Sequence, residues 1–426
     1  MKNRNLIFII LWFSIILLTT NETKATTPAG NDDILLIPKA AYAPTIDGQL
    51  DPIWCNVTNN RMLIFRGGIL PGNWLDFYSS FRVMWDDDNF YLFVSIRDEF
   101  IFNNHSDFWE NDEIELFFDG DNSKNSEATG YDANDVHLHF PFDLVPFSYG
   151  KMNVALMKYA YLKTDLGWNL ELAIPFTAMT FPPNVGHEFG FSIFSGDNDN
   201  QVQREHYVRW WATYLYIWLN PSSWGTAKLT DRVVSDTLDV NYTETKPQID
   251  GNTDEAWPGV SRISHNTYVT DDSLWDINLL NDWKDLQFDY QVMWDDDYFY
   301  ALIQIIDDEK YNQQTNPWDN DGVELYFDGD NSKTDGSYDE NDDRLIFVYK
   351  GSLTSVHSHI DTSNIEYAYA LKGDGWNLEL AIPFANLKFN PAVDHQFGFE
   401  IQINDNDDGE TRENMARWQS NTIELE

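Results

Sequence analysis

The 426-residue chain contains one cysteine, Cys55, and few basic residues. A single cysteine excludes an intramolecular disulfide, so core packing or a bound metal ion has to stabilise the fold. The 27 lysines and arginines face 70 aspartates and glutamates, which gives a formal net charge of −43. Such a field repels nucleic acid and anionic membranes and attracts cations. We therefore expect no nucleic-acid partner and no membrane insertion.

The sequence also lacks the common catalytic signatures. It has no Gly-x-Ser-x-Gly, no His-Glu-x-x-His and no phosphate-binding loop. Paired carboxylates can hydrolyse glycosides, but carboxylates are so abundant in this chain that no pair is informative. We expect no enzyme activity.

Only one long apolar run is present, from Leu6 to Leu18. Lys2 and Arg4 precede it and Thr23-Lys-Ala25 follows it. The run is too short to span a bilayer, and its flanks are typical of a secretory signal peptide over residues 1–25. This predicts a protein that is secreted, periplasmic or displayed at the cell surface.

The rest of the chain contains two copies of one domain. Residues 81–91 recur with few changes as 290–300, and residues 167–176 recur letter for letter as 375–384. So long a period indicates tandem whole domains rather than a solenoid. We place copy one at residues 32–231 and copy two at 233–426, with the second copy short at its C-terminus.

Each copy is rich in short segments of β-forming residues bounded by Asp, Asn and Gly. Examples are residues 90–96, 114–118 and 136–140, and helical periodicity is almost absent. Many short strands with period-two patterning predict an all-β fold, in which each copy is an antiparallel, jelly-roll-like β-sandwich.

The order of the motifs resembles a family 9 carbohydrate-binding module. Both copies carry Ile-Asp-Gly-x-x-Asp-x-x-Trp, a Trp-Asp hairpin, Trp-x-x-Asp-x-x-Glu or a close variant, Tyr-Asp-x-x-Asp or a close variant, Gly-Trp-x-x-Glu-x-x-Ile and a Phe-Gly-Phe strand leading to Asp-x-Asp. The resemblance implies a β-sandwich with bound calcium that holds glucan or xylan chain ends between two tryptophans.

The same resemblance implies the site residues. In copy one they are Trp109 and Glu115, with Trp218 as the second platform, and His139 stands where the family has a cationic ligand contact. In copy two the counterparts of Trp109 and Glu115 are Trp318 and Glu324, and Ile346 takes the place of His139. The counterpart of Trp218 would fall at the last residue, so copy two has no second platform. Packing of Trp109 and Trp218 in the core or at the domain junction is the alternative.

Two indoles suit a sugar because a pyranose presents flat C–H faces and a rim of hydroxyls. Rigid aromatic rings supply apolar contact at low entropy cost, and a carboxylate such as that of Glu115 can accept hydroxyl hydrogen bonds. His137 and His139 share a strand face and could instead ligate a metal, but copy two has Arg344 and Ile346 there.

A pair of acidic turns is the candidate for calcium. Asp119 and Asp121 in copy one, and Asp328 and Asp330 in copy two, offer oxygen ligands at alternate positions. The turns lack the glycine and glutamate of an EF-hand, so calcium would need ligands from several segments. A carboxylate-rich turn without an ion is the alternative, and the acidic composition also fits a merely solvated surface.

The leading hypothesis is thus a secreted, non-catalytic protein that binds β-glucan or xylan-type polysaccharide or oligosaccharide. The alternative is a calcium-stabilised structural or adhesive module pair that contacts a protein partner or the cell surface. Haem binding, known in the wider superfamily, would need a His or Met pair, and none recurs in both copies. Thr422-Ile-Glu-Leu425 is the candidate for a shortened closing strand of copy two, and without it that sandwich has an open edge.

Overall fold

The structure is a computed structural model. It describes residues 34–62, 64–67, 76–125, 130–150, 152–164, 166–211, 217–260, 263–264, 267–268, 286–333, 338–356, 360–387 and 389–418. Within these ranges, no helix has the length and apolar character that crossing a membrane requires. The predicted signal peptide lies outside the described residues.

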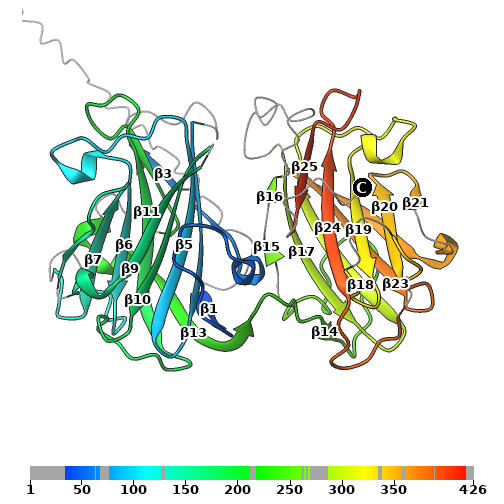
Figure 1. Cartoon of the computed structure of the whole chain (residues 1–426), viewed down its shortest axis with the longest axis horizontal. Helices are drawn as coiled ribbons and strands as arrows, with labels where there is room; N and C mark the ends of the chain where they lie inside the picture. The colour runs from blue at the N-terminus through cyan, green and yellow to red at the C-terminus, as the bar shows by residue number, and fades with distance from the viewer. Residues whose placement is uncertain are drawn as a thin grey trace, which may run out of the picture. The chain divides into compact units, whose positions relative to one another are not determined.

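The first domain is a two-layered β-sandwich (Figure 1). Its strands are β1 (Ile34–Ala40), β2 (Asn60–Arg61), β3 (Ile64–Gly67), β4 (Phe77–Trp85), β5 (Asn89–Asp98), β6 (Glu113–Asp119), β7 (Asp135–Pro141), β8 (Phe147–Tyr149), β9 (Lys158–Thr164), β10 (Gly167–Pro175), β11 (Glu188–Asp197), β12 (His206–Arg209) and β13 (Gly225–Val234). Its short 3-10 helices are η1 (Pro52–Asn56), η2 (Phe108–Glu110), η3 (Val154–Leu156), η4 (Ile217–Leu219) and η5 (Pro221–Ser223).

Hydrogen bonding runs without a break through the first sandwich, in the order β8-β7-β6-β11-β13-β1-β4-β5-β10-β9. The neighbours β13 and β1 join one layer to the other. Most pairs are antiparallel, as predicted, but β1 is parallel to both β13 and β4. The register of β1 against β13 shifts between Ile37 and Lys39, where the strand passes from layer to layer.

The second domain repeats the sandwich, and within the described residues no strand pairing joins its two sheets. Its strands are β14 (Asn241–Tyr242), β15 (Ile263–Ser264), β16 (Thr267–Tyr268), β17 (Gln287–Trp294), β18 (Tyr298–Ile306), β19 (Gly322–Asp328), β20 (Asp342–Val348), β21 (Leu353–Val356), β22 (Glu366–Lys372), β23 (Gly375–Pro383), β24 (Gly398–Asp405) and β25 (Asn414–Arg417), with 3-10 helices η6 (Pro317–Asp319) and η7 (Thr362–Asn364). One sheet has the order β14-β17-β18-β23-β22 and the other β16-β25-β24-β19-β20-β21.

In each domain, apolar side chains at every second position of the strands form the core. In the first sandwich Ile114, Leu116 and Phe118 of β6 are fully buried between the layers, and Trp85 and Trp168 pack into the same cluster. The second core repeats this pattern around Trp376 and Leu325. The all-β sandwich predicted from period-two patterning is confirmed.

A buried carboxylate fastens the first turn of each domain to its sheet. Glu171 on β10 accepts hydrogen bonds from Trp54 Nε1 at 2.9 Å and from the amides of Asp47 and Gly48 at 3.0 Å each. Gly48 has a φ of 83°, and a Cβ there would lie 2.7 Å from Leu162, so only glycine fits. The second domain repeats the contact with Glu379, which accepts from Trp257, Asp250 and Gly251 at 2.8, 2.9 and 2.8 Å.

Candidate functional site

One face of the first sandwich, turned away from the core, carries polar and aromatic side chains that are buried rather than exposed to solvent. On β6, the residues that alternate with the core-facing set are Glu113, Glu115 and Phe117. His139 of β7 lies directly opposite Glu115, and His137 lies opposite Phe117. We call this surface of β7, β6, β11 and β12, turned away from the core, the outer face.

The ionisable groups of the outer face form one connected cluster. His137 Nε2 lies 2.6 Å from Glu115 Oε2, and His139 Nδ1 lies 3.0 Å from Glu113 Oε2. Arg204, from the connection between β11 and β12, places Nη1 3.3 Å from an oxygen of both glutamates. Both glutamates and both histidines are buried. The cluster therefore holds its charges in fixed positions at low dielectric.

The two glutamates titrate differently. Burial and the neighbouring charge of Glu115 raise the pKa of Glu113 well above its ordinary value. Burial also disfavours ionisation of Glu115, but His139 and His137 outweigh it and hold the pKa of Glu115 below its usual range. Burial lowers the pKa of His139 to about 3. Glu115 is thus the ionised acceptor of the cluster at neutral pH, and His139 is a neutral imidazole.

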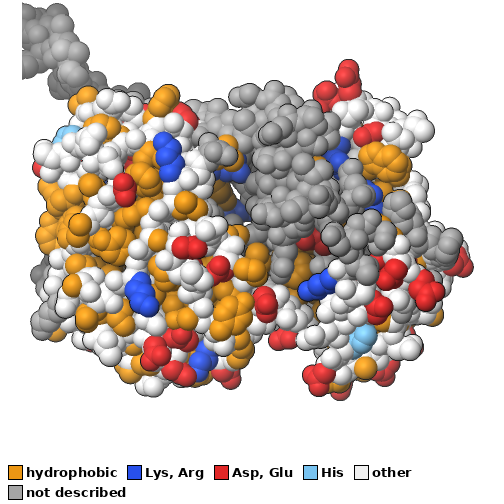
Figure 2. Space-filling model, viewed as in Figure 1, with side chains coloured by type: hydrophobic (Ala, Val, Ile, Leu, Met, Phe, Trp, Pro, Cys, Tyr) orange, Lys and Arg blue, Asp and Glu red, His pale blue; other side chains and the backbone are white. Residues whose placement is uncertain are grey.

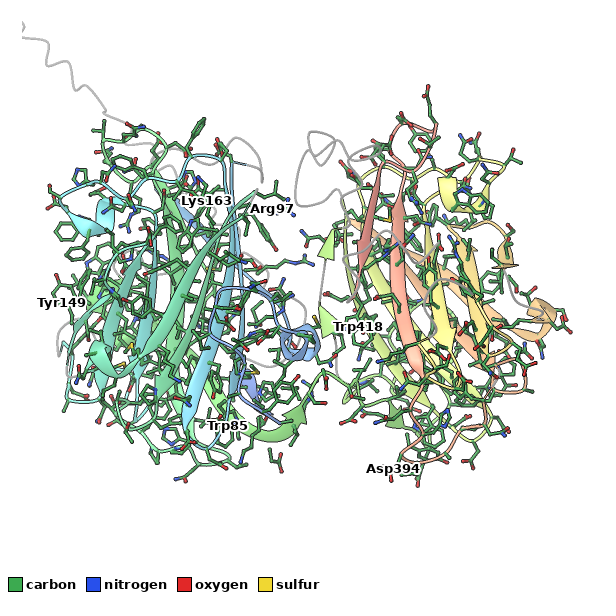
Figure 3. The ribbon with its side chains drawn as sticks, viewed as in Figure 1. Trp85, Arg97, Tyr149, Lys163, Asp394 and Trp418 are labelled. Atoms are coloured by element: carbon green, nitrogen blue, oxygen red, sulfur yellow. The ribbon has the colours of Figure 1, made fainter. Side chains whose placement is uncertain are left out.

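Aromatic rings border one end of this cluster. Trp109, on η2 just before β6, is 39% exposed, and its ring centroid lies 4.7 Å from that of Phe108. Phe147 on β8 stacks on His139 with centroids 4.5 Å apart and planes 7° apart. Tyr149, which is 52% exposed and labelled in Figure 3, lies 5.7 Å from His139 between ring centroids. Trp109 and Tyr149 together offer exposed apolar rings beside a buried carboxylate.

Trp218 lies farther along the same face. It is half-buried on η4 and packs against a cluster that includes Phe117, Phe194 and Trp224. Trp224 Nε1 donates to the carbonyl of Ile217 at 2.9 Å, which fixes the turn that carries Trp218. The structure therefore brings Trp109, Glu115, His139 and Trp218 to one face.

The equivalent face of the second sandwich is organised differently. Glu324 of β19 accepts hydrogen bonds from Arg344 Nε at 2.7 Å, Tyr326 Oη at 2.8 Å and Asn404 Nδ2 at 2.6 Å. Ile346 lies opposite Glu324, where the first sandwich has His139. The aromatic positions of β8 are taken in β21 by Thr354 and Val356, as the pairing with β20 shows. Trp318 on η6 is 36% exposed.

In the acidic turns predicted to bind calcium, the carboxylates accept hydrogen bonds from nearby groups of the chain itself. Asp119 accepts from the amides of Ser123 and Lys124 at 3.1 and 2.8 Å, and Asp121 accepts from Asn134 Nδ2 at 2.8 Å. Asp328 and Asp330 repeat these bonds with Ser332, Lys333 and Asn341 at 3.1, 2.9 and 3.0 Å. Calcium binding by these four aspartates stays a prediction.

A second set of carboxylates, which motif reasoning did not single out as metal ligands, is gathered at one end of each sandwich. In the first domain, carboxylate oxygens of Asp98, Asp197 and Asp199 lie within 4.8 Å of one another. The second domain has a related grouping of Asp307, Asp321 and Asp405, in which Asp307 and Asp405 are the counterparts of Asp98 and Asp197. The signal in the sequence was the recurrence of aspartate at the ends of matching strands in both copies.

Burial disfavours ionisation of these carboxylates, although His206 Nε2 lies 2.7 Å from Asp197 Oδ2 and Lys310 Nζ lies 3.7 Å from Asp307 Oδ1. Burial, and then the charge of Asp98, raises the pKa of Asp197 to about 10. Burial likewise raises the pKa of Asp98 and of Asp307 to about 7, and that of Asp321 to about 9. Asp98 Oδ2 is buried with no hydrogen-bond partner among the described residues. A hard divalent cation coordinated by oxygen would satisfy this arrangement.

The chain matches the family model "Carbohydrate family 9 binding domain-like" over residues 46–232 and again over 249–424. The matched model describes a binding domain, not a catalytic one.

Curated relatives match most of this chain. It is 26% identical over 377 residues to an endo-1,4-beta-xylanase A of Thermoanaerobacterium saccharolyticum, and 27% identical over 378 residues to exoglucanase XynX of Acetivibrio thermocellus. Each alignment covers 88% of this chain but only 29% and 31% of those proteins. A solved family 9 module from Caldicellulosiruptor kristjanssonii in complex with cellotriose aligns with 48% of this chain and 99% of its own, at 22% identity and a TM-score of 0.41.

Proposed function

Since this chain belongs to the carbohydrate family 9 binding domain-like family, we propose that it is a secreted, non-catalytic protein that binds β-glucan or xylan-type polysaccharide through the first sandwich. The observation that carries the proposal is the pairing of exposed Trp109 with the buried, ionised Glu115 on one outer face. The ring gives a sugar an apolar platform, and the carboxylate accepts hydroxyl hydrogen bonds.

The proposed sugar ring lies between Trp109 and Trp218. Trp218 packs against Phe117 and Phe194, which are buried and support it from below, and Glu115 would accept hydrogen bonds from the sugar hydroxyls. Arg204 supports the carboxylate: its guanidinium lies 5.1 Å from the Phe194 ring centroid and is held there as a fixed donor. A preorganised site of this kind spends little ordering entropy when it binds.

The second sandwich serves in this proposal as a structural partner or a weak second site. Glu324 already accepts hydrogen bonds from three side chains, so it has less capacity left for a ligand hydroxyl. Trp318 offers one platform, and a single indole gives an open, weak surface.

We also propose that calcium is held by the buried aspartates at the end of each sandwich. Asp98, Asp197 and Asp199 would hold it in the first domain, and Asp307, Asp321 and Asp405 in the second. The buried Asp98 Oδ2 without a described partner and the gathering of carboxylate oxygens fit a bound cation, which would offset the repulsion between the carboxylates and link distant strands. The acidic side chains spread over both domains on the face shown in Figure 2 would raise the local cation concentration.

A binding screen on the full chain tests the proposal. Retention on insoluble β-1,4-glucan and xylan, and the shift of tryptophan fluorescence with their oligosaccharides, are measured in calcium and in chelator. We expect saturable retention in calcium that Trp109→Ala removes without changing the unfolding temperature. Failure of every β-glucan and xylan to bind would overturn the proposal, and retention that survives Trp109→Ala would move the site elsewhere.

A further inference from the structure

The ionisable cluster on the outer face of the first sandwich contains a set of metal-ligand atoms. Glu115, His137 and His139 each offer one such atom, and the three atoms lie within 4.8 Å of one another. All three side chains are buried, and they come from the paired strands β6 and β7. Two imidazoles with one carboxylate are ligands typical of a divalent transition metal, whereas calcium takes oxygen ligands.

The spacing of these atoms suits a bound ion. With metal–ligand bonds of about 2.0–2.1 Å, tetrahedral coordination places neighbouring ligand atoms about 3.3 Å apart. His137 Nε2 and Glu115 Oε2 are 2.6 Å apart, and the whole set spans no more than 4.8 Å. The observed spacing therefore brackets the one that an ion requires, and small side-chain shifts would admit it.

His139 has a ring nitrogen that is free to coordinate. Its Nδ1 lies 3.0 Å from Glu113 Oε2, but its Nε2 is buried and has no hydrogen-bond partner among the described residues. Only 3% of the residue is exposed, so water does not satisfy this nitrogen. A metal-ligating histidine almost always gives its other ring nitrogen to a carboxylate or a carbonyl, which fixes the ring. His139 already has such a partner in Glu113.

Aromatic neighbours hold both imidazoles in place. His137 stacks on Phe117 with ring centroids 4.2 Å apart and planes 23° apart. His139 stacks on Phe147, and its centroid also lies 4.0 Å from that of His137. Rings that are fixed by packing lose little conformational freedom when they bind an ion.

The second sandwich shows which charge the first cluster lacks. There one carboxylate, that of Glu324, lies 2.7 Å from Arg344 Nε and 3.9 Å from Arg412 Nη1. In the first cluster two carboxylates share the single guanidinium of Arg204. With these groups ionised, one carboxylate and two guanidiniums carry +1, and two carboxylates and one guanidinium carry −1. A divalent ion supplies that difference beside His137, the counterpart of Arg344.

We propose that Glu115, His137 and His139 bind a divalent transition metal ion, with Glu113 as the outer partner of His139. The three protein ligands leave one position of a tetrahedral ion for water. The second sandwich has neither histidine, so we expect one such ion per chain. This site goes beyond the proposed sugar binding, and it differs from the aspartate groups proposed for calcium because its ligands include nitrogen.

A titration of the full chain with Zn²⁺ in excess Ca²⁺ tests the proposal. Isothermal titration measures the zinc affinity, and metal analysis after dialysis counts the bound zinc. We expect one zinc ion per chain, and His137→Ala or His139→Ala should each weaken binding on the order of 100-fold. His187→Ala is the matched control, because His187 stacks on Phe181 outside the cluster, and it should leave the affinity unchanged. No zinc binding by the parent chain, or equal binding by all three variants, would overturn the proposal.

Two further measurements separate a ligand from a residue that only supports the fold. Glu113→Gln should weaken zinc binding about 10-fold, because it changes the partner of a ligand. X-ray absorption at the zinc edge of the parent chain should show two imidazole ligands, and this result does not require any variant to fold. A spectrum with oxygen ligands alone would assign the zinc to the aspartate groups and overturn the proposal. Since none of these readouts involves sugar, the outcome is independent of the proposed function.

Discussion

In the first sandwich Glu115 meets two histidines and Arg204 beside an exposed tryptophan, whereas in the second the equivalent Glu324 is enclosed by Arg344, Tyr326 and Asn404. The cores and the Glu171 and Glu379 contacts are nearly the same in both domains. The residues that face the core or hold the first turn are thus required for folding in both domains. The residues of the outer face are not, and they differ between the two domains. That difference is where the function of each domain has to be sought.

The largest expected effect tests a feature that both sandwiches share. With calcium at about 1,000 times its Kd, binding to the folded state alone stabilises by about 4 kcal/mol. Chelator should therefore lower the unfolding temperature of both domains, as calorimetry would record. Asp98→Asn should remove the calcium response of the first domain only, and Asp307→Asn that of the second only. Identical scans in calcium and chelator would contradict the proposed ion.

Removing the charge of the central glutamate should separate the domains. Glu324→Gln leaves buried Arg344 without its counter-charge and should destabilise the second sandwich by about 3–5 kcal/mol in denaturant unfolding. Sugar affinity should stay the same. Glu115→Gln should instead weaken sugar binding about 10-fold, because a charge-assisted hydrogen bond is lost. If both variants affect only stability, Glu115 is not a ligand contact.

The exposed tryptophans give a second matched pair. Trp109→Ala should reduce oligosaccharide affinity on the order of 100-fold, equivalent to about 3 kcal/mol, since aromatic anchors dominate such sites. Trp318→Ala should change it less than threefold. Isothermal titration with cello- and xylo-oligosaccharides measures both, and a larger loss from Trp318→Ala would reverse the assignment of the two domains.

The smallest expected effect concerns acid stability. Because the folded pKa of His139 is about 3, the unfolded chain takes up a proton near pH 6.5 that the folded chain refuses. The contribution of the neutral imidazole is present above pH 6.5 and lost as the pH falls, by about 2 kcal/mol at pH 5. His139→Gln should lose correspondingly less stability between pH 7.5 and 5 than the parent protein. An equal loss would show that the imidazole is already charged in the fold.

Much of the fold follows from sequence because alternation and repetition are local signals. The segment repeated at 167–176 and 375–384 forms β10 and β23, whose apolar side chains are buried at alternate positions. The pairing of Glu115 with His139 also follows once β6 and β7 are placed in register. The parallel pairing of β1 with β13 was missed because it joins the two ends of the domain.

The rest of the site depends on contacts between distant segments. Arg204 reaches Glu113 and Glu115 from a loop after β11, and its sequence neighbours give no sign of that. The aspartate groups of each domain likewise come from three separate elements. Asp119 and Asp121 stood out in the sequence because they are only two positions apart, yet the structure shows their carboxylates accepting hydrogen bonds from amides of their own turn.

The hydrogen bonds that Glu171 accepts from Trp54, Asp47 and Gly48 have a consequence for synthesis on the ribosome. The opening turn of the domain cannot be secured until a residue more than a hundred positions later has emerged, which takes on the order of 10 s at typical elongation rates. In the second domain, the opening turn likewise cannot be secured until Glu379 has been synthesised. Each half therefore matures as a unit late in its own translation, and the nascent first half can finish before the second begins.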